Sequence, residues 1–232
     1  MRRAILMTLA PFLLCSAGAM RTHAQLTSHP EPPPVQKASG APLIDGVAAR
    51  IEDDIILESE VREMAAFQTL VDGQAKPRMD LLRELANQWI VQGEARAAKF
   101  PLPSATELDN AYQEFAKQFG SPEDFQKRCA AVEITEAGVR RQLQQQLYVL
   151  HFLDYRFRAA AQVDDKQVEK YYDDEFAPQL KARGDSVPQL EEVEDTIREV
   201  LIQRAISERA MKWLDDTRER LKIDIVSQGS GS

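Results

Sequence analysis

The sequence contains little cysteine. Its 232 residues include two, Cys15 and Cys129, and Cys15 lies in an N-terminal segment that we expect to be removed. The single thiol that remains cannot form an internal disulfide, so the fold must be held by packing of its side chains. We interpret Cys129, which is followed by two alanines, as a small buried apolar residue and not as a nucleophile.

Signals of catalysis are also scarce. His151 lies among apolar residues of a predicted helix, and no cysteine or second histidine stands at a spacing suited to a shared metal. The chain has no G-x-S-x-G, no H-E-x-x-H and no glycine loop for phosphate. The acidic pairs Asp53-Asp54 and Asp173-Asp174 are more typical of turns and solvated helix faces than of proton transfer. We therefore predict a protein that is not an enzyme and that uses no metal and no cofactor.

The N-terminus has the pattern of a secretory signal peptide. Arg2 and Arg3 precede the uncharged apolar run 4–14, and small residues follow at 16–19. We predict a signal peptide over residues 1–24, with cleavage after Ala19 or after Ala24, and no membrane span in the mature chain. An uncleaved membrane anchor is the alternative. A lipoprotein is disfavoured because Leu14, before Cys15, is bulkier than lipoprotein processing normally accepts.

Excess positive charge is absent as well. Loss of residues 1–24 removes three arginines and no acidic residue, which shifts the formal net charge from −8 to −11. An acidic chain of this kind repels nucleic acid and anionic lipid, so we predict no nucleic-acid partner.

What the sequence does contain is helical periodicity. Residues 25–43 are rich in proline and polar residues and predict a flexible linker, and residues 227–232 predict a flexible tail. Between them, 44–226 predicts a single helical domain. We expect helices over 59–71, 77–99, 104–120, a short segment from 122, 135–160, 165–176 and 188–221, with a loop over 177–187. Gly93 inside the second helix marks either a close approach of another backbone or an ordinary surface position.

Two strand-like segments flank these helices. Residues 45–57 read as a hairpin with its corner at 52–54, and residues 222–226 alternate apolar and polar side chains. A lone hairpin is marginal in water, so we predict that 222–226 pairs with it and docks the long last helix onto the N-terminal helices. The predicted fold is therefore mainly α, with one small antiparallel sheet built from both ends of the domain.

Aromatic and other large apolar side chains are spread over several of these helices. Helices joined by short loops seldom bury every face, and an uncovered apolar groove is a common mark of a peptide or protein site. As residues that bind an unfolded client in such a groove we predict Met64, Phe67, Phe115 and Phe119.

The order of these segments resembles one family. The opening "VAARIEDDIILESEV" (47–61) is similar to the hairpin and first helix of SurA-type periplasmic chaperones, and "VDDKQVEKYYDDEF" (163–176) resembles the helix that leads to the parvulin domain in that family. The closing segment, 188–226, resembles the long helix and strand that pack back on the first domain. The resemblance implies a SurA-N-like fold, a periplasmic location and a chaperone activity of the helical core.

The chain departs from that family at one place. The parvulin prolyl isomerase domain normally stands between the last two of those segments, where this chain has only residues 177–187. This is far below the roughly 40 residues that a domain needs to fold unaided. We therefore do not expect this chain to have the prolyl isomerase activity of that family.

We thus predict a chaperone that works without ATP and binds unfolded outer-membrane or secreted proteins. A helical scaffold or adaptor with one fixed envelope partner is an alternative, and a degenerate prolyl isomerase is another. A homodimer formed by exchange of the C-terminal helix is also compatible with the pattern.

Overall fold

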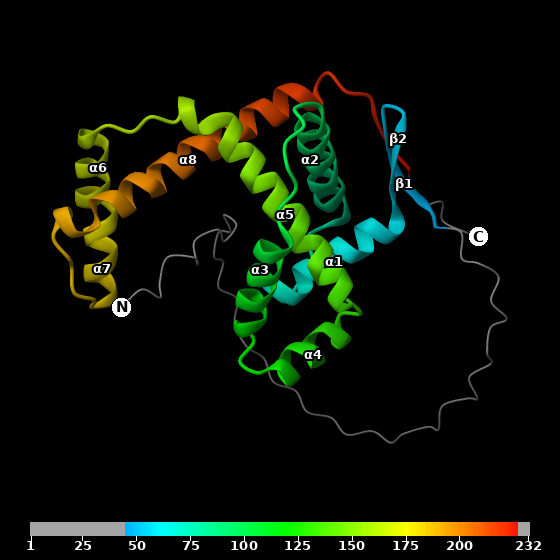
Figure 1. Ribbon diagram of the computed structural model, residues 1–232, viewed down its shortest axis with the longest axis horizontal. Coiled ribbons are helices and arrows are strands. Elements are labelled where there is room, and N and C mark those ends of the chain that lie inside the picture. The colour runs from blue at the N-terminus through cyan, green and yellow to red at the C-terminus, as the bar shows by residue number, and fades with distance from the viewer. Residues whose placement is uncertain (1–44, 227–232) are drawn as a thin grey trace, which may run out of the picture. The chain divides into compact units, whose positions relative to one another are not determined.

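The computed structural model describes residues 45–226 (Figure 1). The predicted signal peptide (1–24), linker (25–43) and tail (227–232) lie outside the described residues. The elements follow in this order: β1 (Val47–Ile51), β2 (Asp54–Leu57), α1 (Glu58–Asp72), α2 (Arg78–Ala97), α3 (Ala105–Lys117), α4 (Pro122–Ala131), α5 (Glu136–Phe157), α6 (Asp165–Tyr171), α7 (Ala177–Arg183), α8 (Leu190–Arg218) and β3 (Ile223–Ile225). The mainly helical fold with a small antiparallel sheet is as predicted.

The sheet joins the two ends of the described chain. Its strand order is β2-β1-β3, and both pairings are antiparallel. Ala49 pairs with Ile225 and Ile51 with Ile223, and the backbone N–H of Val226 donates to the carbonyl oxygen of Ala48 at 3.0 Å. The predicted pairing of the last strand with the opening hairpin is thus confirmed.

Helices α1 and α2 cover the sheet. Ala48, Ile51 and Ile56 are buried against apolar side chains of these two helices. The hydrophobic cluster that results consists of Ala48, Ala49, Ile51, Ile56, Val61, Met64, Leu81, Leu82, Leu85 and Ala86. A two-stranded hairpin is marginal by itself. Here β3 supplies a third strand, and helices α1 and α2 supply the cover that buries its apolar side chains.

Side-chain caps begin several of the helices where the sequence predicts them. Ser104 caps α3: its Oγ accepts from the backbone N–H of Glu107, whose carboxylate accepts from the backbone N–H of Ser104 at 2.8 Å. These hydrogen bonds, that from the Ser104 backbone first, lower the pKa of Glu107. Thr135 caps α5 in the same way, by accepting from the N–H of Gly138 at 3.0 Å.

One predicted loop is a helix. Residues 177–187 were expected to be irregular, yet Ala177–Arg183 forms α7, which continues from a π-helical turn at Tyr172–Phe176. Pro178 lies in the first turn of α7, directly after the π-helical turn. The loop is therefore limited to the residues after Gly184, whose φ of 77° ends α7.

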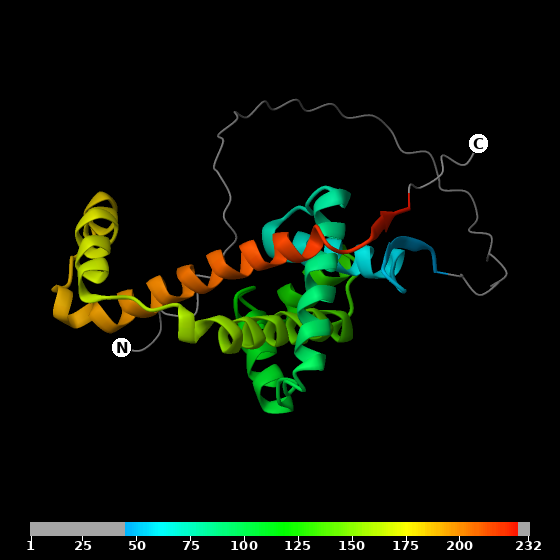
Figure 2. The same cartoon turned by 90° about the horizontal axis from the view of Figure 1, so that it is seen from above.

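The long helix α8 connects the α6–α7 end to β3 (Figure 2). It contacts α6, α5 and α2 along its length, and Trp213 and Leu214 pack on a cluster formed by α2 and α5. It is shorter than the predicted 188–221. Of the predicted apolar stripe, Ile197 is buried, whereas Met211 is 59% exposed, so α8 leaves part of its apolar surface in contact with solvent.

Candidate functional site

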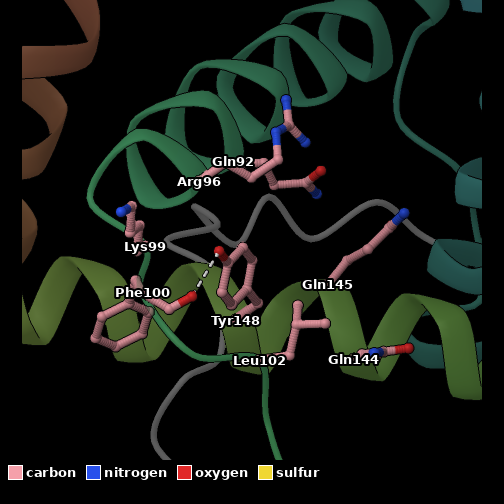
Figure 3. Close-up of a pocket in the computed structure, with 8 residues that line it drawn as sticks. All are labelled: Gln92, Arg96, Lys99, Phe100, Leu102, Gln144, Gln145 and Tyr148. Atoms are coloured by element: carbon pink, nitrogen blue, oxygen red, sulfur yellow. Dashed lines mark hydrogen bonds between the residues drawn. The ribbon is translucent and has the colours of Figure 1, made fainter.

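A cavity of about 470 Å³ lies between the C-terminal part of α2 and the middle of α5. Figure 3 shows side chains from both helices extending into the space between them, together with residues of the segment that follows α2. The lining residues are Gln92, Arg96, Lys99, Phe100, Leu102, Gln144, Gln145 and Tyr148. They combine aromatic, aliphatic, amide and cationic groups in one place.

The end of α2 forms one wall of this cavity. The backbone N–H of Phe100 donates to the carbonyl oxygen of Ala95 at 2.9 Å, and that of Lys99 donates to Arg96 at 3.0 Å. The bond from Phe100 to Ala95 spans six residues. Such a bond closes a helix when the residue just before the donor adopts a left-handed backbone conformation. Lys99 is that residue, with φ 53°. The turn directs Phe100 back toward α5.

Phe100 joins three aromatic side chains of α5. The centre of its ring lies 6.0 Å from that of Tyr148, 5.5 Å from that of Phe152 and 5.2 Å from that of Tyr155. Phe152 is fully buried, while Tyr155 is 67% exposed. The row of rings therefore runs from the core to the surface, and two of its members, Phe100 and Tyr148, line the cavity.

Leu102 extends the apolar surface of the cavity. Its side chain is 65% exposed, nearly the same exposed fraction as that of Tyr155. The hydroxyl of Tyr148 donates to the carbonyl oxygen of Phe100 at 3.3 Å, so that group is used inside the fold and its ring presents carbon to the cavity. An extended chain could thus place apolar side chains against Leu102 and the rings.

The polar groups of the cavity are amides and cations. Gln92, Gln144 and Gln145 bring amide groups, and the Oε1 atom of Gln145 is buried with no hydrogen-bond partner among the described residues. Arg96 and Lys99 are exposed, and neither makes an ion pair within residues 45–226. Amides can bind a peptide backbone, and free cations favour an anionic group.

A second cavity, also of about 470 Å³, lies among α3, α4 and the start of α5. Tyr112 and Phe125 line it together with Cys129. The Arg140 guanidinium lies 4.2 Å from the centre of the Tyr112 ring, and burial, followed by the nearby Glu136 charge, raises the pKa of Tyr112.

Cys129 is buried as the sequence analysis expects. Its side chain belongs to the hydrophobic cluster of Phe115 and Phe125, and burial raises the pKa of its thiol. A raised pKa reduces the thiolate fraction at neutral pH and so disfavours nucleophilic chemistry.

Three of the four predicted client-binding residues lie in the core. Met64 packs in the cluster under the sheet, while Phe67 and Phe115 stack with their ring centres 5.4 Å apart. All three are at most 9% exposed, so their apolar surface is not open to an incoming chain in this conformation. Phe119 is half-buried, with its ring centre 5.2 Å from that of Phe115. Their assignment as binding residues stays a prediction, and the open apolar surface lies elsewhere.

The sequence analysis did not identify the residues of the α2–α5 cavity as a site. In the sequence, Phe100-Pro101 follows the end of the predicted helix 77–99, and the three glutamines Gln144–Gln146, which are typical of a solvated helix face, lie within the predicted helix 135–160. A usable signal was present in Leu102, which stands between Pro101 and Pro103. The residue before a proline is kept out of the helical region, so the sequence predicts that Leu102 lies in an extended connection, and such connections run over the surface.

Within residues 45–226 no three histidine, cysteine, aspartate or glutamate side chains come together in a way that could hold a metal. None of the helices in this range combines the length and the apolar character needed to cross a bilayer. No family model matches the chain, and no curated protein matches it significantly.

Proposed function

We propose that the chain is an ATP-independent periplasmic chaperone that binds unfolded outer-membrane or secreted proteins. The observation that carries the proposal is the α2–α5 cavity, in which the exposed Leu102 and the rings of Phe100 and Tyr148 lie beside three glutamine amides. The exposed Tyr155 ring, 5.2 Å from that of Phe100, extends this apolar surface beyond the cavity. Apolar surface with amides around it suits an extended polypeptide, whose side chains and backbone require both kinds of contact.

The size of the open surface supports weak binding. A few apolar side chains on a shallow surface give about −7 to −8 kcal/mol, which corresponds to a Kd on the order of micromolar. A client held at this affinity dissociates without an energy source. The acidic surface of the chain, with a formal net charge of −8, favours solubility of the complex.

The SurA-like order of segments supports the same proposal. The sheet that joins β1 with β3 and the packing of α8 on α2 and α5 agree with the arrangement that the resemblance implies. Only α7 and a short connection stand where the family carries its parvulin domain, so we include no isomerase activity in the proposal.

The experiment is suppression of client aggregation, followed by light scattering with an unfolded outer-membrane protein diluted from denaturant. The test variant is Leu102→Gln combined with Tyr155→Gln. Leu102 lines the cavity and the Tyr155 ring contacts that of Phe100 at its edge; both side chains are about two-thirds exposed, so their replacement leaves the core intact. The matched control is Val71→Gln combined with Met79→Gln, which removes side chains that are 50% and 53% exposed but do not line the cavity.

We expect the wild type and the control to suppress aggregation equally, and the test variant to need several-fold more protein for the same effect. Absence of suppression by the wild type would contradict the proposal. An equal loss of suppression in the test and control variants would show that the cavity is not the client-binding site. Binding of many unrelated unfolded chains is also expected, whereas tight binding of one folded protein alone would favour an adaptor. Catalysis of proline isomerisation in a short peptide would favour the degenerate isomerase.

A further inference from the structure

We propose that the cavity between α2 and α5 binds the free carboxyl end of an extended polypeptide whose last residue is apolar. The inference rests on the proposed function and specifies which part of the client this cavity takes. It is carried by three features of the cavity: two cations without an ion pair, a buried amide oxygen without a partner, and exposed apolar surface.

The cations are the first feature. Arg96 and Lys99 both line the cavity, and neither pairs with a carboxylate within the described residues. Other cations there, Lys127 among them, also lack an ion pair, so what distinguishes Arg96 and Lys99 is that they lie together at an apolar cavity. Cationic side chains near a helix end often donate to its last carbonyl groups, but the carbonyl groups at the end of α2 do not need Arg96 or Lys99 as donors. Those of Glu94, Ala95 and Arg96 already accept from backbone N–H groups of the closing turn, at 2.9 to 3.0 Å. Both side chains are thus available to an anionic group of a ligand.

The backbone conformation of Lys99 is a further argument that its charge serves the cavity. Its φ of 53° lies in the left-handed region, which glycine adopts without strain and which a lysine adopts at a cost. Glycine is the usual residue at this position of a helix end. A lysine that occupies a strained position beside a cavity is explained if its charge serves that cavity.

Gln145 and Leu102 complete the set. The Oε1 atom of Gln145 is buried and has no donor among the described residues, and its side chain lines the cavity. A rotation of this side chain toward the cavity lets Oε1 accept from an N–H of the ligand, which satisfies an acceptor that the fold leaves unpaired. Leu102, 65% exposed, offers a contact for an aliphatic or aromatic side chain. The ligand is therefore expected to carry a negative charge, an N–H donor and an apolar group.

The last residue of a polypeptide carries these three groups on a single Cα atom: the carboxylate, the amide N–H and the side chain. An internal aspartate or glutamate supplies its carboxylate from the side chain and so gives up the apolar group at that position. A cavity of about 470 Å³ has room for one or two residues, which favours a ligand that presents all three groups together.

The experiment compares three fluorescein-labelled decapeptides by anisotropy titration of the purified protein. The first ends in phenylalanine with a free carboxylate, the second is the same peptide with a C-terminal amide, and the third is the amide with a glutamate as its penultimate residue. We expect the free acid to bind about 10-fold more tightly than both amides, as for the loss of one charge-assisted hydrogen bond.

Lys99→Gly is the decisive variant because it removes the charge and relieves the backbone. We expect its midpoint of unfolding to be equal to or above that of the wild type, while the preference for the free acid falls to within about 2-fold. Lys127→Ala, which removes an exposed lysine of α4 that does not line the cavity, is the matched control and should keep the full preference.

Equal binding of free acid and amide by the wild type would overturn the inference, as would an unchanged preference in Lys99→Gly. Binding of the internal glutamate peptide as tightly as the free acid would overturn the choice of a chain end. These outcomes are distinct from failure of the proposed function. A protein that suppresses aggregation without preferring the free acid loses only this inference, and one that prefers the free acid without suppressing aggregation loses only the chaperone proposal.

Discussion

Glu52 and Lys222, 170 positions apart in the chain, are joined by two hydrogen bonds. The backbone N–H of Glu52 donates to the carbonyl oxygen of Lys222 at 3.0 Å, and the backbone N–H of Lys222 donates to Glu52 Oε1 at 2.7 Å. The corner of the hairpin thereby fixes the point at which the chain leaves α8 and enters β3.

The first prediction concerns this link. Glu52→Ala removes the carboxylate that accepts from Lys222, and we expect β3 to open more often, with a local cost of about 1 kcal/mol. Hydrogen exchange at the amides of Glu52 and Val226 should then be about 5-fold faster. Glu52→Gln keeps an acceptor oxygen and should retain most of the protection. Unchanged exchange in Glu52→Ala would mean that the side chain does not contribute to docking of β3.

A second prediction separates the core of the aromatic row from its surface. Phe152 is 1% exposed and packs with Val91, Ala95 and Tyr148, so Phe152→Ala should lower the free energy of unfolding by about 3–5 kcal/mol. Tyr155, less than one turn further along α5, is 67% exposed, and Tyr155→Ala should cost less than about 1 kcal/mol. Urea unfolding followed by circular dichroism measures both, and similar losses would contradict the burial described here.

The third prediction is a gain in stability at Gly93. A Cβ atom added at this position meets nothing within 4 Å, so the alternative of a close backbone approach is not supported. Gly93→Ala should therefore raise the free energy of unfolding by about 0.5–1 kcal/mol through helix propensity. The change in urea midpoint tests this, and a loss of stability would indicate a close approach that the structure lacks.

The fourth prediction is a dependence on pH at the α5–α8 contact. Arg158 donates to Asp154 of α5 at 2.9 Å and to Glu199 of α8 at 2.7 to 3.0 Å. These hydrogen bonds lower the pKa of both carboxyl groups. A carboxylate with a lowered pKa in the folded state stabilises the fold above its unfolded pKa, near 4, and this contribution is lost as pH falls through the folded value.

Acid should therefore loosen α8 from α5 at pH values below about 4. The Asp154→Asn, Glu199→Gln double variant lacks both titrating groups, so its stability should vary less with pH between about 5 and 2 than that of the wild type. Urea midpoints measured across this range provide the comparison. Because both side chains are partly exposed, high salt should reduce the difference. An identical pH profile for the two proteins would contradict the role of this pair.

The fold could largely be predicted from local signals, because caps and periodicity are encoded within a few residues. Ser104 with Glu107, and Thr135, start their helices as predicted, and the alternation at Ile223 and Ile225 forms the third strand. The helix α7 was not predicted, because it is short, contains Pro178 and continues from a π-helical turn at Tyr172–Phe176.

The candidate site could not be predicted in the same way, because burial depends on which helices meet. Phe67 and Phe115 have the aromatic character of a binding surface, yet α1 and α3 face each other and stack the two rings. Leu102 attracts less notice in the sequence, yet it lies in the connection between α2 and α3 and is 65% exposed. The unpaired cations Arg96 and Lys99 also emerge only once the positions of all described carboxylates are known.

The sheet has a consequence for the time course of folding. A ribosome produces β1 and β2 early, while β3 is among the last segments of the described chain to be synthesised, and the edge of β1 around Ala49 has no native partner in the meantime. Completion of the sheet is thus a late, long-range event that must follow synthesis of nearly the whole chain. Until β3 arrives, the edge of β1 stays open to pairing with other strands.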